Sequence, residues 1–237
     1  MTWGRLYGVS VGPGDPELLT LKALRILQTV PVVAYPAGRG GQAGLAETII
    51  QSYLAPEQIR LPLWFPYVFE AETLEPAWEE AARETFSYLS RGLDVGFACE
   101  GDGGFYGTFN YLAQTLAQNY PDLVIERLPG VSSPWAAAAA LGLPLTLQDQ
   151  RLLILPALYY ADELEAALSQ AEAVVLLKVR QVYPQVWLWL QALDLLERAW
   201  VIEWATTPRQ RIYHPLTAYP ELALSYFSLL LIKTHSS

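Results

Sequence analysis

Short apolar runs alternate along this chain with segments of helical periodicity. Residues 5–11 and 32–35 are mostly apolar and predict buried strands. Between them, leucines recur every three residues from 18 to 27, and Asp15 followed by Pro16 is typical of a helix N-terminus. Strands that alternate with helices favour parallel sheets covered by helices on both faces. The pattern therefore predicts the α/β fold class.

The alternation continues to the end of the chain. Further strands are predicted at residues 94–99, 123–127, 151–155, 174–178, 199–203 and 226–233, and further helices at residues 45–53, 70–91, 105–118 and 134–141. A turn-forming cluster, Asn119-Tyr120-Pro121-Asp122, separates two blocks that each contain strands and helices. We therefore expect two α/β domains, residues 1–118 and residues 119–237.

The composition excludes several classes of protein. Of the 237 residues, 52% are hydrophobic and 16% are charged, which excludes a disordered chain. The net charge of −9 is unfavourable for binding nucleic acid. No apolar run is long enough to span a bilayer and no secretion segment is recognisable, so we expect a cytoplasmic protein without a membrane anchor. One cysteine and two histidines exclude an intrachain disulfide and a Cys/His zinc site, and we expect no bound metal.

The turn after the first predicted strand is rich in glycine. In open α/β sheets, ligands bind outside the carboxyl ends of the strands, so this turn is a candidate ligand contact. It does not fit a dinucleotide site, because Glu17 stands where that fingerprint needs a glycine and Pro13 lacks a backbone N–H. A phosphate-binding loop with a Gly-Lys-Ser/Thr ending is also absent from the sequence. NAD and ATP are therefore not the expected ligands.

Four segments, in order along the chain, resemble the signatures of the tetrapyrrole methylases. Residues 6–20 resemble the opening segment of that family, and residues 99–108 resemble its G-D-P-x-x-Y-G segment. Residues 128–133 resemble its P-G-[IV]-[ST]-[SA] turn, and residues 203–212 resemble its late A-T-x-P-x-x-R-I segment. Within the family, the details are most similar to the precorrin-2 C20-methyltransferases. One departure is Gly103, which stands where the family usually has proline and is expected to leave that loop less rigid.

This resemblance implies a methyl transfer from S-adenosylmethionine to C20 of precorrin-2, giving precorrin-3A in corrin biosynthesis. It also implies an active-site cleft between the two α/β domains, with the N-terminal domain on the tetrapyrrole side and the C-terminal domain sharing the S-adenosylmethionine site. A homodimer is expected from the resemblance and from the eight tryptophans. Two alternatives stay open: the same methylation of cobalt-factor II, and a non-catalytic member that binds a tetrapyrrole or S-adenosylmethionine.

The resemblance also implies which residues contact the cofactor. By family correspondence these are residues on turns after strands, where small side chains permit close approach: Pro13, Glu100, Gly101, Asp102, Phe105, Ser132, Ser133, Lys178 and Ala205.

The methylated carbon must lose its proton, so a nearby base would help the reaction. The candidates are Asp102, Lys178 and Glu203, each at the end of a predicted strand. Asp102 has an alternative role as a hydrogen-bond acceptor that fixes its loop, and the other two could form an ion pair. The carboxylate-rich substrate favours Arg39, in a glycine-rich loop, as a binding residue. Asp15 is a further candidate for substrate binding, with helix capping as its alternative.

Overall fold

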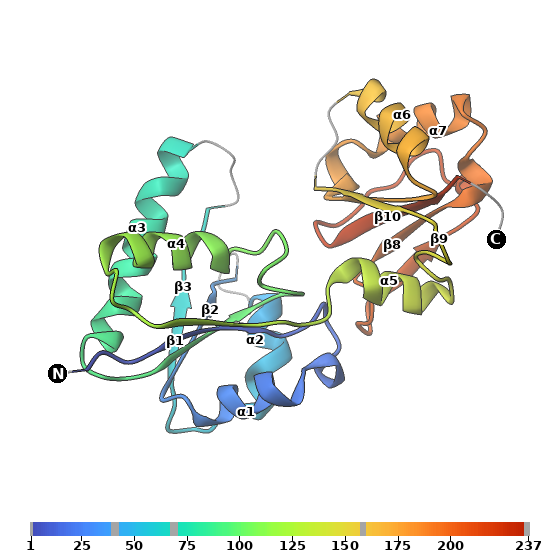
Figure 1. Cartoon of the computed structure of the whole chain (residues 1–237). Coiled ribbons are helices and arrows are strands. Elements are labelled where there is room, and N and C mark those ends of the chain that lie inside the picture. Colours follow the sequence, from blue (N-terminus) through green and yellow to red (C-terminus); the bar gives the residue numbers. More distant parts are fainter. Residues whose placement is uncertain (1, 39–42, 67–70, 157–159, 235–237) are drawn as a thin grey trace. The chain divides into compact units, whose positions relative to one another are not determined.

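The computed structural model describes residues 2–38, 43–66, 71–156 and 160–234. The chain forms two compact units, Met1–Ser132 and Ser133–Ser237. Each unit is built around one five-stranded sheet with helices on its faces (Figure 1). The α/β class predicted from the alternating pattern is confirmed.

The first unit contains a parallel sheet in the order β3-β2-β4-β1-β5. Every residue of its three inner strands is buried, which is typical of parallel strands covered on both faces. The strands are β1 (Leu6–Ser10), β2 (Val32–Pro36), β3 (Ile59–Leu63), β4 (Val95–Cys99) and β5 (Ile125–Leu128). The helices are η1 (Pro16–Leu18), α1 (Leu21–Thr29), α2 (Leu45–Ile50), η2 (Gln51–Tyr53), α3 (Ala71–Leu89) and α4 (Phe109–Asn119), where η marks a 3-10 helix.

The helices cover both faces of this first sheet. α1 and α2 lie on one face, and α3 and α4 lie on the other (Figure 1). Asp15 caps η1, because its side chain accepts a hydrogen bond from the Glu17 N–H at 2.9 Å. Thr20 caps α1 by accepting from the Ala23 N–H at 3.2 Å. The single helix predicted after Asp15 is thus divided into two at Leu19, whose backbone is extended.

The second unit contains a mixed sheet in the order β6-β7-β10-β8-β9. β6 and β7 are parallel, β10 is antiparallel to both β7 and β8, and β9 is antiparallel to β8. The prediction of parallel sheets is therefore wrong for this unit. Its strands are β6 (Leu152–Leu155), β7 (Ala173–Leu177), β8 (Ala199–Glu203), β9 (Arg211–Tyr213) and β10 (Ser228–Lys233). Its helices are α5 (Ser133–Leu141), α6 (Ala161–Gln170), η3 (Val179–Gln181), α7 (Tyr183–Ala192), η4 (Leu196–Arg198) and η5 (Leu216–Ala218).

Both faces of the second sheet are also covered. α6 and α7 pack on one face, and the alanine-rich α5 packs on the other (Figure 1). Lys233 at the end of β10 is buried, and its ammonium donates a hydrogen bond to the Leu145 carbonyl oxygen. None of the helices in the described ranges combines the length and the apolar character that crossing a bilayer would require.

The division between the units falls later than the sequence analysis placed it. The strand predicted at residues 123–127 is β5, which pairs with β1 and so belongs to the first sheet. The turn after residue 118 connects α4 to β5, and it therefore lies inside a strand-helix-strand crossover rather than between domains. As a result, the first unit extends to Ser132.

Gly8, in the middle of β1, tests the packing of α4 against the first sheet. A Cβ atom on Gly8 would lie 2.2 Å from Cε1 of the buried Phe109 ring. We expect Gly8→Ala to lower the free energy of unfolding by about 1–3 kcal/mol, as overpacked cores do. Urea unfolding measures the change. In a Phe109→Leu background the same substitution should cost less, and equal costs in the two backgrounds would contradict the predicted clash.

Candidate functional site

The first sheet brings predicted site residues to one edge. Because all its strands are parallel, their carboxyl ends lie at the same edge, where open α/β sheets bind ligands. The predicted residues follow three neighbouring strands: Pro13 and Asp15 after β1; Glu100, Gly101, Asp102 and Phe105 after β4; Ser132 after β5. Arg39 lies outside the described residues.

The turns after β1 and β4 are joined through their backbones. The Gly12 N–H donates to the Gly101 carbonyl oxygen at 3.2 Å, and the Gly101 N–H donates to the Gly12 carbonyl oxygen at 2.8 Å. Both glycines have left-handed backbones, with φ of 78° and 65°. A residue with a side chain would be strained at either position, so the glycines allow this reciprocal pair to form.

Asp102 joins the turn after β4 to the turn after β5. Its Oδ1 accepts a hydrogen bond from the Gly104 N–H at 2.7 Å, and its Oδ2 accepts one from the Gly130 N–H at 2.8 Å. These bonds give Asp102 the loop-fixing role that was the alternative to catalysis. Each carboxylate oxygen has a second lone pair, so Asp102 can still accept a hydrogen bond from a ligand.

Ser10, which the sequence analysis did not select, lies at the centre of this arrangement. Its buried hydroxyl donates to the Leu128 carbonyl oxygen at 2.6 Å and accepts from the Gly103 N–H at 2.9 Å. Gly103 was expected to leave its loop less rigid, but its N–H has a defined partner. The sequence carries no signal for Ser10, because both partners are distant along the chain.

Gly101 lies beside Ser132, the predicted cofactor residue after β5. A Cβ atom on Gly101 would lie 3.9 Å from Cα of Ser132, so two of the predicted cofactor residues are neighbours. The absence of a side chain at position 101 leaves its backbone open to close approach by another group. Phe105 continues the same turn, with its N–H donating to the Asp102 carbonyl oxygen at 3.0 Å.

Glu100 connects β4 to the start of α2. Its Oε1 accepts a hydrogen bond from the Ala46 N–H at 3.3 Å. Burial raises the pKa of this carboxyl, and the backbone hydrogen bonds oppose that shift. Glu100 therefore holds α2 against the edge that carries the predicted site.

The second unit has a corresponding edge with strained residues. β10 is antiparallel to both β7 and β8, so β7 and β8 point their carboxyl ends the same way. Lys178 directly follows β7, and Ala205 follows β8 after one residue. Lys178, Trp204 and Thr206 all have left-handed backbones, with φ of 54°, 50° and 67°. Such strain costs about 1–3 kcal/mol per residue and is concentrated at functional sites, while the cofactor roles of Lys178 and Ala205 stay predictions.

The remaining predicted cofactor residue, Ser133, and the packing around Trp204 also belong to the second unit. Ser133 is the first residue of α5. Trp204 packs against Phe227, which directly precedes β10, and the Arg209 guanidinium lies 3.9 Å from the centre of the Trp204 ring. The left-handed turn after β8 is therefore held by a cation–π contact and by aromatic packing.

Glu203 has a structural role at the end of β8. Its Oε1 accepts a hydrogen bond from the Ser225 N–H at 2.5 Å, and its Oε2 accepts from the Tyr213 hydroxyl at 2.8 Å. Burial acts to raise the pKa of Glu203, but these hydrogen bonds outweigh it and the pKa is lowered. Glu203 thus links β8 to β9 and to the loop before β10.

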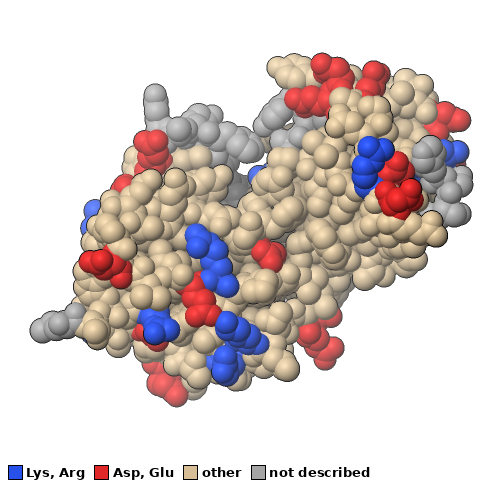
Figure 2. Space-filling model, in the orientation of Figure 1, with Lys and Arg blue, Asp and Glu red and all other residues tan. Residues whose placement is uncertain are grey.

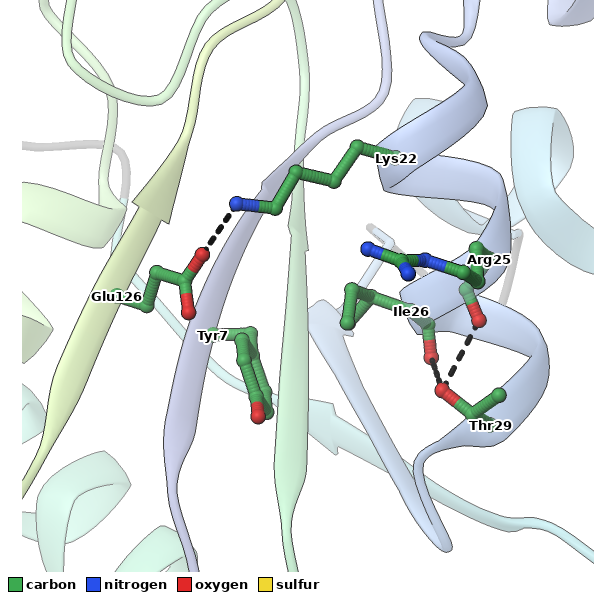
Figure 3. A pocket seen from close by; sticks show the side chains of 6 residues that line it. All are labelled: Tyr7, Lys22, Arg25, Ile26, Thr29 and Glu126. Carbon is green, nitrogen blue, oxygen red and sulfur yellow. Dashed lines mark hydrogen bonds and ion pairs between the residues drawn. The ribbon is translucent and has the colours of Figure 1, made fainter.

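A groove of about 400 Å³ lies elsewhere on the first unit, and none of the predicted site residues lines it. Lys22 extends from α1 across β1, which carries Tyr7, and its ammonium lies 2.5 Å from Glu126 of β5 (Figure 3). The hydrogen bond from Lys22 lowers the pKa of Glu126. Figure 2 shows basic side chains in small groups beside acidic ones on a face that is otherwise mostly uncharged.

The described ranges contain no group of three or more His, Cys, Asp or Glu side chains arranged to hold a metal ion.

Comparison with known proteins identifies a family. Residues 5–219 match the model of the tetrapyrrole (corrin/porphyrin) methylases. The chain is 34% identical to the precorrin-2 C(20)-methyltransferase of a Sinorhizobium species, over 97% of this chain and 95% of that protein. It is 32% identical to the cobalt-precorrin-2 C(20)-methyltransferase of Salmonella typhimurium, over 97% of this chain and 96% of that protein.

Other relatives are longer. The cobalamin biosynthesis protein CobIJ of Mycobacterium tuberculosis is 35% identical over 97% of this chain, but the chain spans about half of that protein, 46% of its length.

Among solved structures, the uroporphyrin-III C-methyltransferase of Thermus thermophilus in complex with S-adenosylhomocysteine has the same fold. It matches with a TM-score of 0.69 and 26% identity, over 97% of each chain.

The buried Glu203 carboxylate should make the stability of the protein depend on pH. Its pKa lies below the ordinary 4.5 in the folded protein, so its stabilising contribution is present above that pH and is lost as the pH falls through the folded pKa. Glu203→Gln removes the charge and the titration together. We expect the free energy of unfolding of the wild type to exceed that of the variant at neutral pH, and the difference to shrink below pH 4.5. Urea unfolding across this range measures both proteins, and a difference independent of pH would contradict the prediction.

Proposed function

We propose that this chain, which belongs to the tetrapyrrole methylase family, transfers a methyl group from S-adenosylmethionine to C20 of precorrin-2, giving precorrin-3A in cobalamin biosynthesis. The observation that carries the proposal is the match, over almost the full length of both chains, to a relative named for this reaction. The geometry of the first unit supports it, because the predicted cofactor residues of that unit follow neighbouring strands at one edge of the sheet.

Residues from both units are proposed to hold the donor. In the first unit these are Pro13, Glu100, Gly101, Asp102, Phe105 and Ser132, and in the second unit they are Ser133, Lys178 and Ala205. When bound, S-adenosylmethionine supplies an electrophilic methyl group: its bond to sulfur breaks with the electron pair staying on sulfur, a bond to C20 forms, and C20 then loses its proton. A solved family member in complex with S-adenosylhomocysteine supports this choice of donor.

The residues of the chain act mainly by positioning. The reacting atoms must be held about 3–3.5 Å apart and in line, which favours a rigid site that excludes water. The hydrogen-bonded turns after β1, β4 and β5 supply such rigidity. Asp102, Lys178 and Glu203 remain the proposed groups for proton removal, and the hydrogen bonds of Glu203 also support β8. Asp15 and Arg39 remain predictions for substrate binding.

A second candidate is the same methylation of the cobalt-containing substrate. The relative from Salmonella typhimurium, named for cobalt-precorrin-2, is nearly as similar to this chain as the relative from Sinorhizobium. A non-catalytic member that binds the donor or the tetrapyrrole is the third possibility to be tested.

We also propose that the enzyme is a cytoplasmic homodimer. Large exposed aromatic side chains support an interface: Trp64 is 65% exposed, Trp135 is 52% exposed and Tyr160 is 67% exposed. Sedimentation at several protein concentrations measures the oligomeric state.

The proposed reaction predicts a defined product. Incubation of the protein with precorrin-2 and S-adenosylmethionine carrying a carbon-13 methyl group should add one labelled methyl, which NMR should locate on C20. A parallel reaction with the cobalt-loaded substrate distinguishes the two substrates by their rates. Binding of S-adenosylhomocysteine without any methylated product would contradict the enzymatic proposal and favour the binding module. A methyl group on another carbon would contradict the assignment to C20.

The proposed donor site predicts that a large side chain at position 132 blocks ligand binding. A tryptophan there would fill the space beside Gly101, so Ser132→Trp should abolish detectable binding of S-adenosylhomocysteine in calorimetry. The control is Ser169→Trp, which places the same side chain on an exposed position of α6 and should bind as the wild type does. Unchanged binding by Ser132→Trp would show that the donor site is misplaced.

A further inference from the structure

The turn after β4 contains a feature that the proposed reaction does not explain. Gly103 occupies the position where the resembling family segment has proline. Its backbone N–H donates a buried hydrogen bond of 2.9 Å to Oγ of Ser10. A proline has no N–H and could not make this bond.

The Ser10 hydroxyl uses this bond to connect three neighbouring strands. Ser10 is the last residue of β1 and is 1% exposed. It accepts from Gly103 in the turn after β4, and it donates to Leu128 at the end of β5. In the sheet, β1 lies between β4 and β5, so one hydroxyl joins the carboxyl ends of all three. Gly130 packs against the same side chain, because a Cβ atom there would lie 2.4 Å from Cβ of Ser10.

Cys99 explains why position 103 has no side chain. The backbone of Gly103 is not left-handed, so its conformation does not require glycine. A Cβ atom on Gly103, however, would lie 2.4 Å from Sγ of Cys99, although it would lie 3.8 Å from Cβ of Cys99. The sulfur therefore fills the space of the missing Cβ.

The Cys99 thiol is itself fixed in place. It is 2% exposed and lies 3.3 Å from the Val9 carbonyl oxygen, to which it donates. Burial raises the pKa of the thiol, so it stays protonated and remains a donor.

We infer that Ser10, Cys99 and Gly103 together are positioning residues, which hold the turn of residues 101–104 in the conformation that binds the methyl donor. The Ser10 hydroxyl supplies the restraint that a proline ring would otherwise supply, and the Cys99 sulfur packs the space that opens beside the glycine. The role in donor binding rests on the function proposed above.

Removing side-chain volume at position 99 while adding it at position 103 tests the packing of Cys99 against Gly103. Gly103→Ala alone should displace the turn and raise the dissociation constant of S-adenosylhomocysteine by about tenfold or more, since one misplaced hydrogen bond has an effect of this size. Adding Cys99→Ala removes the sulfur and leaves the new Cβ in ordinary contact with Cβ of residue 99. The double variant should bind within about threefold of the wild type, as expected for a coupled pair. Cys99→Ala alone should lower both stability and affinity, because it leaves an unfilled space beside Gly103.

Removal of the Ser10 hydroxyl tests the hydrogen-bonding part. In Ser10→Ala, the amide proton of Gly103 should exchange with solvent about tenfold faster or more, and the affinity for S-adenosylhomocysteine should fall by a similar factor. Thr85→Val is the matched control, because Thr85 is another buried hydroxyl that donates to a backbone carbonyl, that of Ala81 within α3. The control should lose stability without losing affinity. Steady-state kinetics of Ser10→Ala should show a larger change in KM for the donor than in kcat.

The outcomes separate this inference from the proposed function. Wild-type protein that does not bind S-adenosylhomocysteine would overturn the proposed function and the ligand role of the turn together. If the wild type binds, then normal affinity of Ser10→Ala would overturn the positioning role of the hydroxyl. If adding Cys99→Ala to Gly103→Ala fails to restore either the affinity or the free energy of unfolding, the coupling between positions 99 and 103 is overturned. Rescue in both measurements would support it.

Discussion

The carboxyl ends of β1, β4 and β5 are held together by hydrogen bonds between turns that are far apart in the sequence. Gly12 and Gly101 exchange backbone hydrogen bonds, while Ser10 and Asp102 each connect turns from different strands. Isolated turns of this kind would sample many conformations, and the cost of ordering them would fall on ligand binding. Because the sheet and these bonds order them in advance, the edge can present backbone groups to a ligand in fixed positions.

The second unit orders its corresponding edge by different means. Lys178 and Trp204 adopt left-handed backbones directly after β7 and β8, at a cost that the surrounding packing must offset. Glu203 ties the end of β8 to Tyr213 and Ser225, and Arg209 stacks on the Trp204 ring. Glu203, a catalytic candidate from the sequence, thus uses both carboxylate oxygens to support the turn beside it.

Much of the fold could be predicted from apolar runs, because a buried strand such as residues 199–203 consists of consecutive, mainly apolar residues and its two ends can be located in the sequence. β3 and β9 were missed, since β3 is an edge strand that contains Pro62 and β9 has only three residues. The helix predicted from residue 105 begins at Phe109, because the glycine-rich segment before it forms a turn. The domain boundary was placed too early because a turn inside a crossover has the same composition as a linker.

The candidate site was predictable where resemblance or strand ends marked a residue, as for Gly101 and Ser132. Ser10 could not be found that way, since its partners are 93 and 118 residues away in sequence and only the sheet order brings them together. The most direct test of the account is a crystal structure of the protein with S-adenosylhomocysteine. We predict that the ligand lies against the backbone of Gly101 and Ser132, with the turns after β1, β4 and β5 joined by the hydrogen bonds of Ser10, Gly12 and Asp102. A ligand bound in the groove beside Lys22 and Arg25, with no ligand at Gly101 and Ser132, would contradict it.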